Sequence, residues 1–351
     1  MNHIKVNLKV IGIITVVILA LIGGYVYIQI GPYDKNSNKE IVVEIPNGST
    51  LTDVSDVLKE NKLIKNKTLF KLVAKFKPTE NGVKAGKYLL KQSYSNSKIL
   101  DILIEGKFYN DGIKITIPEG STYKEVVKIL TDKGIGKTEV YEKLINNPKE
   151  FYNEFSYLNE KDIKSLEGFL YPDTYYFNKD DSEKEVLSAM LKRFNQIYTD
   201  KLKEQQKKMG LTLQQVVNLA SIIEKEAVLD EDRPMIASVF YNRLDIDMPL
   251  QSDATIQYAF DERKDRVMYK DLKIDSPYNS YVNKGLPPTP ISNPGVKSIE
   301  AALNPADTDY LYFVATMEGK NNYSKTYEEH LKHVESYKEE RDKLNQEKSE
   351  K

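Results

Sequence analysis

The strongest candidate for acid–base chemistry is a glutamate near the end of an apolar helical segment, residues 212–227. Thr212, with a glutamine three positions later, is a capping-box start. The next turns are apolar almost all round, which predicts a buried helix. Glu224 follows Ala220 by four residues and Val217 by seven, so it shares their face. A carboxylate on a buried face is desolvated, and this raises its pKa and lets it hold a proton, as a general acid must.

The same residues allow a second interpretation, in which the buried helix simply ends and Glu224, Lys225 and Glu226 form its solvated exit. Structural ion pairs perturb carboxylates as well as catalytic sites do. Glu226 lies about 200° further round the helix than Glu224, so we expect that the two carboxylates cannot act as a pair from one face.

Most other enzyme chemistries have no support in this sequence. The chain has no cysteine, which excludes thiol nucleophiles and Cys-based zinc sites. His330 and His333 lack a third ligand nearby, and with His3 they are the only histidines. A Ser-His-Asp triad is therefore unsupported, and no Gly-x-Ser-x-Gly, P-loop or dinucleotide fingerprint is present. The net charge of −1 gives no argument for nucleic acid. We expect no metal and no cofactor.

One apolar run is long enough to cross a membrane. Residues 10–30 carry no charge, and about 20 such residues span the hydrocarbon core as a helix. The run is too long for a signal peptide and is not followed by an Ala-x-Ala-like exit, which predicts an uncleaved anchor behind a tail of residues 1–9. Lysines on the two sides are nearly balanced, so the positive-inside rule leaves the orientation open.

Beyond the anchor we expect an α+β body that begins after a polar tether, residues 31–40. The stretch IPNGST at residues 45–50 recurs as IPEGST at residues 117–122. Each copy predicts a strand, a Pro-x-Gly turn, a Ser/Thr cap and an amphipathic helix. Between the copies we expect a strand over residues 83–90 and a helix over residues 97–104, with Ser97 as its cap.

This strand–turn–helix unit resembles small glycan-binding modules of the LysM kind; the alternative is a spacer that lifts the catalytic part off the membrane. We assign residues 41–110 to a LysM-like subdomain and 111–150 to a second repeat unit. A catalytic domain is expected over residues 151–338, followed by a charged tail, residues 339–351.

Eight motifs occur together and in order. They are LEGFLYPDTYYF (166–177), LASIIEKEA (219–227), IASVFYNRL (236–244), LQSDATIQYA (250–259), SPYNSY (276–281), GLPPTPISNPG (285–295), AALNPADTDYLYFV (301–314) and the EEH that ends at His330. With them the chain resembles the endolytic murein transglycosylases of the MltG/YceG-like family, from the membrane span to about Tyr337.

The resemblance implies a single-pass membrane enzyme, with a cytoplasmic N-terminus, whose extracytoplasmic body cuts nascent peptidoglycan strands internally. Its partners would be the membrane, the glycan strands and, through them, peptidoglycan synthases. In this family the acid/base is the first glutamate of a Ser-Ile-x-Glu-Lys-Glu stretch, which corresponds to Glu224 here. Such an enzyme forms 1,6-anhydro-MurNAc ends, because the 6-hydroxyl of MurNAc attacks its own C1. The nucleophile is tethered, so one carboxylate can suffice.

Candidates for holding the sugar are polar residues of two motifs: Gln251, Ser252, Asp253, Thr255, Asn279 and Tyr281. Each could instead be part of a loop scaffold. Two rival functions stay open. One is a muramidase that uses water, with Asp253 or Glu167 as its second carboxylate. The other is a non-catalytic wall-binding protein that regulates synthases.

Overall fold

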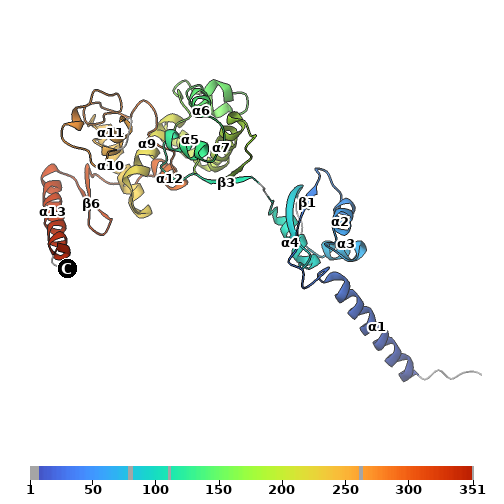
Figure 1. Ribbon diagram of the computed structural model, residues 1–351. Helices are drawn as coiled ribbons and strands as arrows, with labels where there is room; N and C mark the ends of the chain where they lie inside the picture. The colour runs from blue at the N-terminus through green and yellow to red at the C-terminus, as the bar shows by residue number, and fades with distance from the viewer. Residues whose placement is uncertain (1–7, 78–81, 110–111, 261–263, 350–351) are drawn as a thin grey trace, which may run out of the picture. The chain divides into compact units, whose positions relative to one another are not determined.

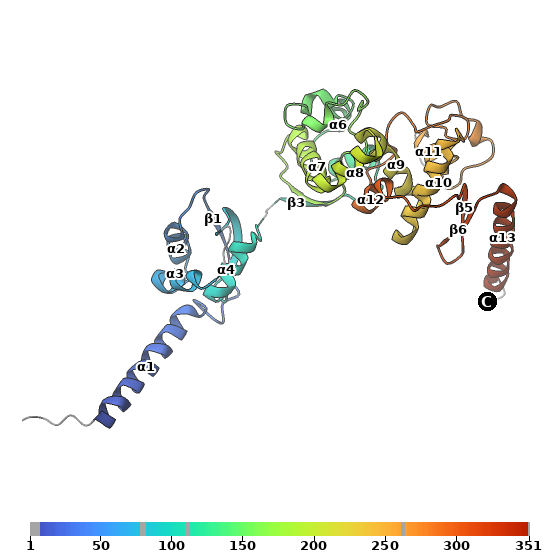
Figure 2. The same cartoon turned by 180° about the vertical axis from the view of Figure 1, so that it is seen from behind.

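The computed structural model describes residues 8–77, 82–109, 112–260 and 264–349. The chain divides into two units, Met1–Asp111 and Gly112–Lys351, each with its own core (Figures 1 and 2). The fold mixes helices and strands, in agreement with the expected α+β class. In the described residues the strands form three separate two-stranded antiparallel sheets, and helices make up most of the remaining regular structure.

The first unit begins with helix α1, Leu8–Ile30. Its segment Gly12–Ile30 has a mean hydropathy of 2.3, and none of it is buried in the protein. It is the one helix in the described part of the chain that is long and apolar enough to cross a membrane. The apolar run of the sequence therefore forms a continuous helix whose exposed surface fits a hydrocarbon environment.

The body of the first unit packs three helices with one two-stranded antiparallel sheet. Its elements are β1 (Glu40–Ile45), α2 (Leu51–Glu60), α3 (Lys67–Lys75), β2 (Gly86–Lys91) and α4 (Asn96–Glu105). Strands β1 and β2 pair with Val43 opposite Tyr88, and both side chains enter the core. The expected helix over residues 97–104 begins one position earlier, at Asn96, because Ser95, and not Ser97, caps it by accepting from Lys98 N.

The second unit contains the rest of the chain. It comprises β3 (Ile113–Thr116), α5 (Tyr123–Asp132), α6 (Thr138–Ile145), η1 (Pro148–Phe151), η2 (Ser156–Leu158), β4 (Thr174–Phe177), α7 (Glu183–Ile197), α8 (Asp200–Met209), α9 (Leu213–Glu226), η3 (Asp230–Asp232), α10 (Arg233–Asp245), α11 (Asp253–Tyr258), η4 (Asp271–Lys273), α12 (Val296–Leu303), β5 (Tyr312–Ala315), β6 (Asn321–Ser324) and α13 (Tyr327–Ser349). Strand β3 pairs with β4, so residues 113–116 belong to the same unit as the region expected to be catalytic. The last helix, α13, runs into the charged tail.

The two IPxGST stretches adopt the same local geometry. Gly48 and Gly120 have φ values of +79° and +73°, a region that glycine enters without strain. The serine hydroxyl that follows each glycine donates to the proline carbonyl, at 2.8 Å in the first stretch and 2.7 Å in the second. Thr50 and Thr122 then each cap a helix in a capping box. The shared sequence therefore specifies one turn and one helix start in both places.

Helix α9 lies at the centre of the second unit. It packs against α12, α10 and α11, and both views show it between the α5–α8 helices and α10–α11 (Figures 1 and 2). Thr212 caps its first turn in a capping box with Gln215, as expected. Nearly every residue from Leu213 to Ile223 is buried. The contacts explain the apolar sequence, because each face of the helix meets a different neighbour.

Candidate active site

Helix α9 ends at Glu226 because Ala227 turns to an extended conformation, with φ −83° and ψ 126°. The two glutamates of the last turn point in different directions, as the helical spacing predicts. Glu224 extends toward the start of α12, and Glu226 toward the start of α11.

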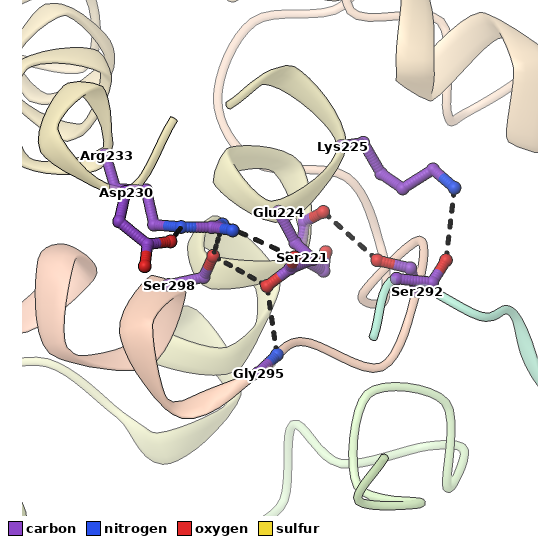
Figure 3. A network of polar contacts seen from close by, with 9 residues as sticks. Ser221, Glu224, Lys225, Asp230, Arg233, Ser292, Gly295 and Ser298 are labelled. Carbon is purple, nitrogen blue, oxygen red and sulfur yellow. Dashed lines mark hydrogen bonds and ion pairs between the residues drawn. The ribbon is translucent and has the colours of Figure 1, made fainter. Parts of the chain in front are cut away.

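Glu224 is closed off by hydrogen bonds and an ion pair. Its Oε2 accepts from the backbone N of Gly295 at 3.0 Å and from Ser298 Oγ at 2.8 Å. Its Oε1 lies 3.3 Å from Arg233 Nη1, and the two side chains are only 6% and 8% exposed. Figure 3 shows this network around the end of α9. Because Gly295 is the N-cap residue of α12, the carboxylate also sits at the positive end of a helix.

Arg233 is bound on two further sides. It pairs with Asp230 at 3.0 Å through Nε, and its Nη1 donates to Ser298 Oγ at 2.5 Å (Figure 3). The sequence predicts a desolvated Glu224, and the side chain is indeed almost buried. Its surroundings are nevertheless polar, because Arg233, Ser298 and the Gly295 amide are partners of its two carboxylate oxygens.

Glu226 has a different environment. Burial raises the pKa of its carboxyl, and the nearby charge of Asp253 raises it further. A hydrogen bond from Ser252 Oγ to Oε1, 2.5 Å long, acts in the opposite direction. A carboxyl group with a raised pKa can carry a proton near neutral pH, which is the property required of a general acid.

Glu226 also lines a cavity of about 450 Å³. The wall is built from the start of α5, the end of α9, helix α11 with the following Phe260, residues 265–267 and Ile291. Asp253, Gln257 and Tyr258 contribute from α11, and Lys225 stands beside Glu226. The volume suits one or two sugar rings. Glu226 therefore places a carboxyl group at the wall of a cavity of ligand-binding size.

Four of the predicted sugar-binding residues lie at this cavity or next to its wall. Ser252 bonds to Glu226, as described, and Asp253 lines the cavity while accepting from Tyr281 OH at 2.7 Å. Gln251 precedes them with an exposed side chain and a φ of +51°, which is uncommon for a residue other than glycine. The loop before α11 and the SPYNSY segment are thus joined at the cavity.

The other two predicted residues lie inside the protein. Thr255 is fully buried, and its hydroxyl donates to Ser252 O at 2.7 Å. Asn279 is also fully buried, and its Nδ2 donates to the carbonyls of Leu272 and Ile274 at 3.1 and 2.8 Å. These side chains satisfy the backbone of the two loops, which matches the scaffold alternative.

Glu167 is a second buried carboxyl group near the cavity. It is fully buried, and burial raises its pKa to about 8. Its two oxygens accept from Tyr123 N at 3.0 Å each, and from Tyr258 OH and Asn293 Nδ2 at 3.0 and 3.1 Å. Because Tyr258 lines the cavity, Glu167 holds one cavity wall to the start of α5.

Comparison with known proteins places this site in a family. The sequence model of the YceG-like family matches residues 43–336. The chain belongs to the YceG-like family. That region covers the whole of the site and both IPxGST stretches.

In the described residues no group of three or more His, Asp or Glu side chains is arranged to hold a metal ion.

Two relatives and one solved structure define the similarity. A protein of Bacillus subtilis named endolytic murein transglycosylase is 39% identical over 317 residues, with 87% of each chain covered. A protein of Streptococcus pneumoniae with the same name is 32% identical over 89% of this chain, which spans 61% of that longer relative. The crystal structure of a yceG-like protein from Listeria monocytogenes is 40% identical, with a TM-score of 0.58. The match covers 84% of this chain and 99% of that one.

Sequence reasoning missed Arg233, the Gly295 amide and the second IPxGST turn as parts of this YceG-like site. The second IPxGST turn reaches α9: Lys225 Nζ donates to Gly120 O at 3.1 Å. Gly120 N donates to Asn293 O at 2.9 Å. The repeat itself was the available signal, since its second copy has a glutamate, Glu119, where the first has an asparagine. Burial and the charge of Glu224 raise the pKa of Glu119.

Proposed function

We propose that this YceG-like protein is an endolytic murein transglycosylase that cuts glycan strands of peptidoglycan at internal MurNAc–GlcNAc bonds. The relatives that carry this name support the substrate and the reaction. The observation that carries the proposal furthest is the carboxyl group of Glu226, which has a raised pKa and lines a cavity large enough for sugar rings.

The proposed reaction needs one carboxyl group. The acid gives its proton to the glycosidic oxygen as the bond from that oxygen to C1 of MurNAc breaks. The 6-hydroxyl of the same MurNAc then forms the new bond to C1 and returns its proton to the carboxylate. The products are a 1,6-anhydro-MurNAc end and a free GlcNAc 4-hydroxyl. Water does not enter this balance, and the tethered nucleophile avoids the entropy cost of recruiting one.

Two glutamates of the last turn of α9, Glu224 and Glu226, are candidates for the proton donor. The family resemblance predicts Glu224, and that assignment stays a prediction. We propose Glu226 instead, because Glu224 has an arginine and two hydrogen-bond donors on its oxygens, whereas Glu226 faces the cavity. Both carboxylate oxygens of Glu224 already have partners within the protein, namely Arg233, Ser298 and the Gly295 amide.

Asp253 and Tyr281 are proposed to contact the sugar next to Glu226. Their mutual hydrogen bond fixes both groups at the start of α11. An ionised Asp253 would stabilise the positive charge that develops on C1 in an oxocarbenium-like transition state. Gln251 and Ser252, just before α11, are proposed to bind the same sugar. Thr255 and Asn279 would support these residues rather than touch the substrate.

The first unit is proposed to be a LysM-like glycan-binding subdomain, residues 41–110, with residues 111–150 as its second copy. The matched turn geometry and paired capping boxes support a common origin for the two stretches. Copies that keep the same turn could still differ in role, because the second is built into the unit that holds the cavity.

The membrane helix is proposed to place the N-terminus in the cytoplasm and the body outside, where peptidoglycan lies. The apolar, unburied α1 supports anchoring. Cutting strands beside the membrane would bring the enzyme close to peptidoglycan synthases, which are the proposed protein partners. Release of a strand end there would terminate or trim glycan synthesis.

Product analysis separates this proposal from its two rivals. Purified glycan strands are digested in water enriched in heavy oxygen, and the new MurNAc ends are analysed by mass spectrometry. A transglycosylase gives unlabelled anhydro ends, one water lighter than hydrolysed ends. A muramidase that uses Asp253 or Glu167 gives labelled reducing ends, and a wall-binding regulator gives no new ends. The burial of Glu167 argues against its activating water.

A further inference from the structure

A cavity of about 390 Å³ lies at the junction of α1 with the body of the first unit. The last turn of α1 supplies Tyr27, Ile28 and Ile30, and α3 supplies Val73. The cavity is adjacent to the end of the candidate membrane span, which runs to Ile30. If α1 crosses the bilayer, this cavity sits at the boundary between the acyl chains and the headgroups.

Two lysines line the same cavity. Lys65 donates through Nζ to the carbonyl of Ile28 at 3.2 Å, which holds its positive charge at the end of α1. Lys35, which follows the end of α1 in the sequence, is the second lysine that lines the cavity. Ser95 and Ser97, at the start of α4, add hydroxyl groups. None of the described residues that line this cavity is acidic.

Helix α3 extends the basic surface beside the cavity. It packs against α1 and carries Lys67, Lys71 and Lys75 in nine residues. Lys67 pairs with Asp56, whereas the ion pairs of the described residues leave Lys71 and Lys75 without a carboxylate. Lysines on one surface with apolar side chains between them are typical of helices that lie in a membrane interface.

Two apolar side chains of this segment face solvent. Leu72 is 46% exposed, and Phe76, the residue that ends α3, is 80% exposed. An exposed phenylalanine costs free energy in water, and burial among lipid chains would recover it. Phe76 therefore offers an apolar side chain for burial, and the neighbouring lysines offer attraction to anionic lipid. Interfacial binding needs both of these contributions.

From these contacts we infer that the cavity bounded by α1, α3 and Ser95 binds the headgroup of an anionic phospholipid, and that α3 lies on the membrane surface. Lys35 and Lys65 would bind the phosphate, Ile30 and Val73 would contact the acyl chains, and Leu72 and Phe76 would enter the interface. The lipid would fix the first unit at the membrane surface. The inference rests on α1 spanning the membrane and is independent of the reaction.

The test uses the full chain reconstituted in nanodiscs of phosphatidylcholine, or of an equal mixture of phosphatidylcholine and phosphatidylglycerol. Native mass spectrometry then measures which lipid stays bound to the released protein. We expect retention of phosphatidylglycerol, and a loss of about fivefold for each of Lys35→Gln and Lys65→Gln, since one lysine near a membrane surface contributes about 1 kcal/mol. Inorganic phosphate should not displace the lipid.

The matched control removes two lysines elsewhere in the same unit, Lys87→Gln and Lys107→Gln, and should retain the lipid as the unaltered chain does. Equal retention of both lipids, equal losses in the control, or displacement by inorganic phosphate would each overturn the inference. Failure of the chain to enter nanodiscs would instead refute the membrane span on which it rests.

The α3 contact has its own measurement. Because the chain has no cysteine, Leu72→Cys accepts a single environment-sensitive fluorophore. Lipids that carry a quencher at the headgroup should quench it in discs that contain phosphatidylglycerol, and the double variant Lys71→Gln, Lys75→Gln should abolish this quenching. Quenching that is the same in both kinds of disc would mean that α3 does not bind anionic lipid.

Discussion

Ser252 donates a hydrogen bond of 2.5 Å from its Oγ to Oε1 of Glu226, and so joins the start of α11 to the end of α9. The bond stabilises the ionised carboxyl group, while burial favours the protonated form. Glu226 is therefore held between opposing influences on its pKa, as a group that must both give and take a proton requires. Glu224, two residues earlier, has an arginine on the corresponding atom.

Ser252→Ala should shift the pH dependence of the reaction. Loss of the hydrogen bond removes a stabilising contact from the carboxylate, so the pKa of Glu226 rises. A general acid is active while protonated, and the alkaline limb of kcat/KM should move to higher pH by about one unit. The control is Ser298→Ala, which removes the corresponding bond from Glu224 and should leave that limb in place. A shift in the control alone would identify Glu224 as the titrating group.

Glu224→Gln should destabilise the fold, because it leaves Arg233 buried with a weakened set of partners. Removing one member of a buried ion pair costs roughly 3 kcal/mol. Chemical denaturation of the full chain in detergent measures this loss in the free energy of unfolding. Glu226→Gln, which replaces a carboxyl group whose ionisation is opposed by burial, should cost far less. Equal losses for the two variants would show that Glu224 has no special structural role.

Glu167 should make stability depend on pH. Its pKa is about 8 in the folded protein, above the ordinary value of 4.5, so the folded state binds the proton more tightly. The stability that this proton contributes is complete below the unfolded pKa and is lost as the pH rises toward 8. The free energy of unfolding should fall more steeply over that interval than in Glu167→Gln. Parallel curves for the two proteins would refute the assignment.

Protease treatment tests the proposed topology. Protease added to intact cells or spheroplasts should digest the body from about residue 31 onward and leave α1 in the membrane. Protection of the body until the membrane is opened would mean that the orientation is reversed. The control is a cytoplasmic protein that stays intact throughout.

Local patterns in the sequence predicted much of this fold. The capping box at Thr212, the buried face of α9 and the two IPxGST turns depend on residues close together in the chain, and these appear as expected. The helix α4 began earlier than predicted because Ser95 and Ser97 are equally good caps by type, and only packing chooses between them.

The site was harder to predict, because neighbours distant in sequence define it. Burial of Glu224 could be read from periodicity, but its partner Arg233 and the amide of Gly295 come from α10 and the start of α12. Likewise, the polar side chain of Asn279 has the same type whether it binds a sugar or a backbone carbonyl. Sequence spacing specifies the direction in which a side chain leaves its helix. The partners that the side chain meets in that direction depend on the tertiary fold.

The most direct test of the account compares Glu226→Gln with Glu224→Gln on purified glycan strands, at a temperature where circular dichroism shows both variants folded. Release of 1,6-anhydro-MurNAc ends is followed by mass spectrometry. We predict that Glu226→Gln abolishes release while still binding strands, because glutamine fills the same space but cannot transfer a proton. Folded Glu224→Gln should retain substantial activity. An active Glu226→Gln beside an inactive, folded Glu224→Gln would contradict the account and return the role of proton donor to Glu224.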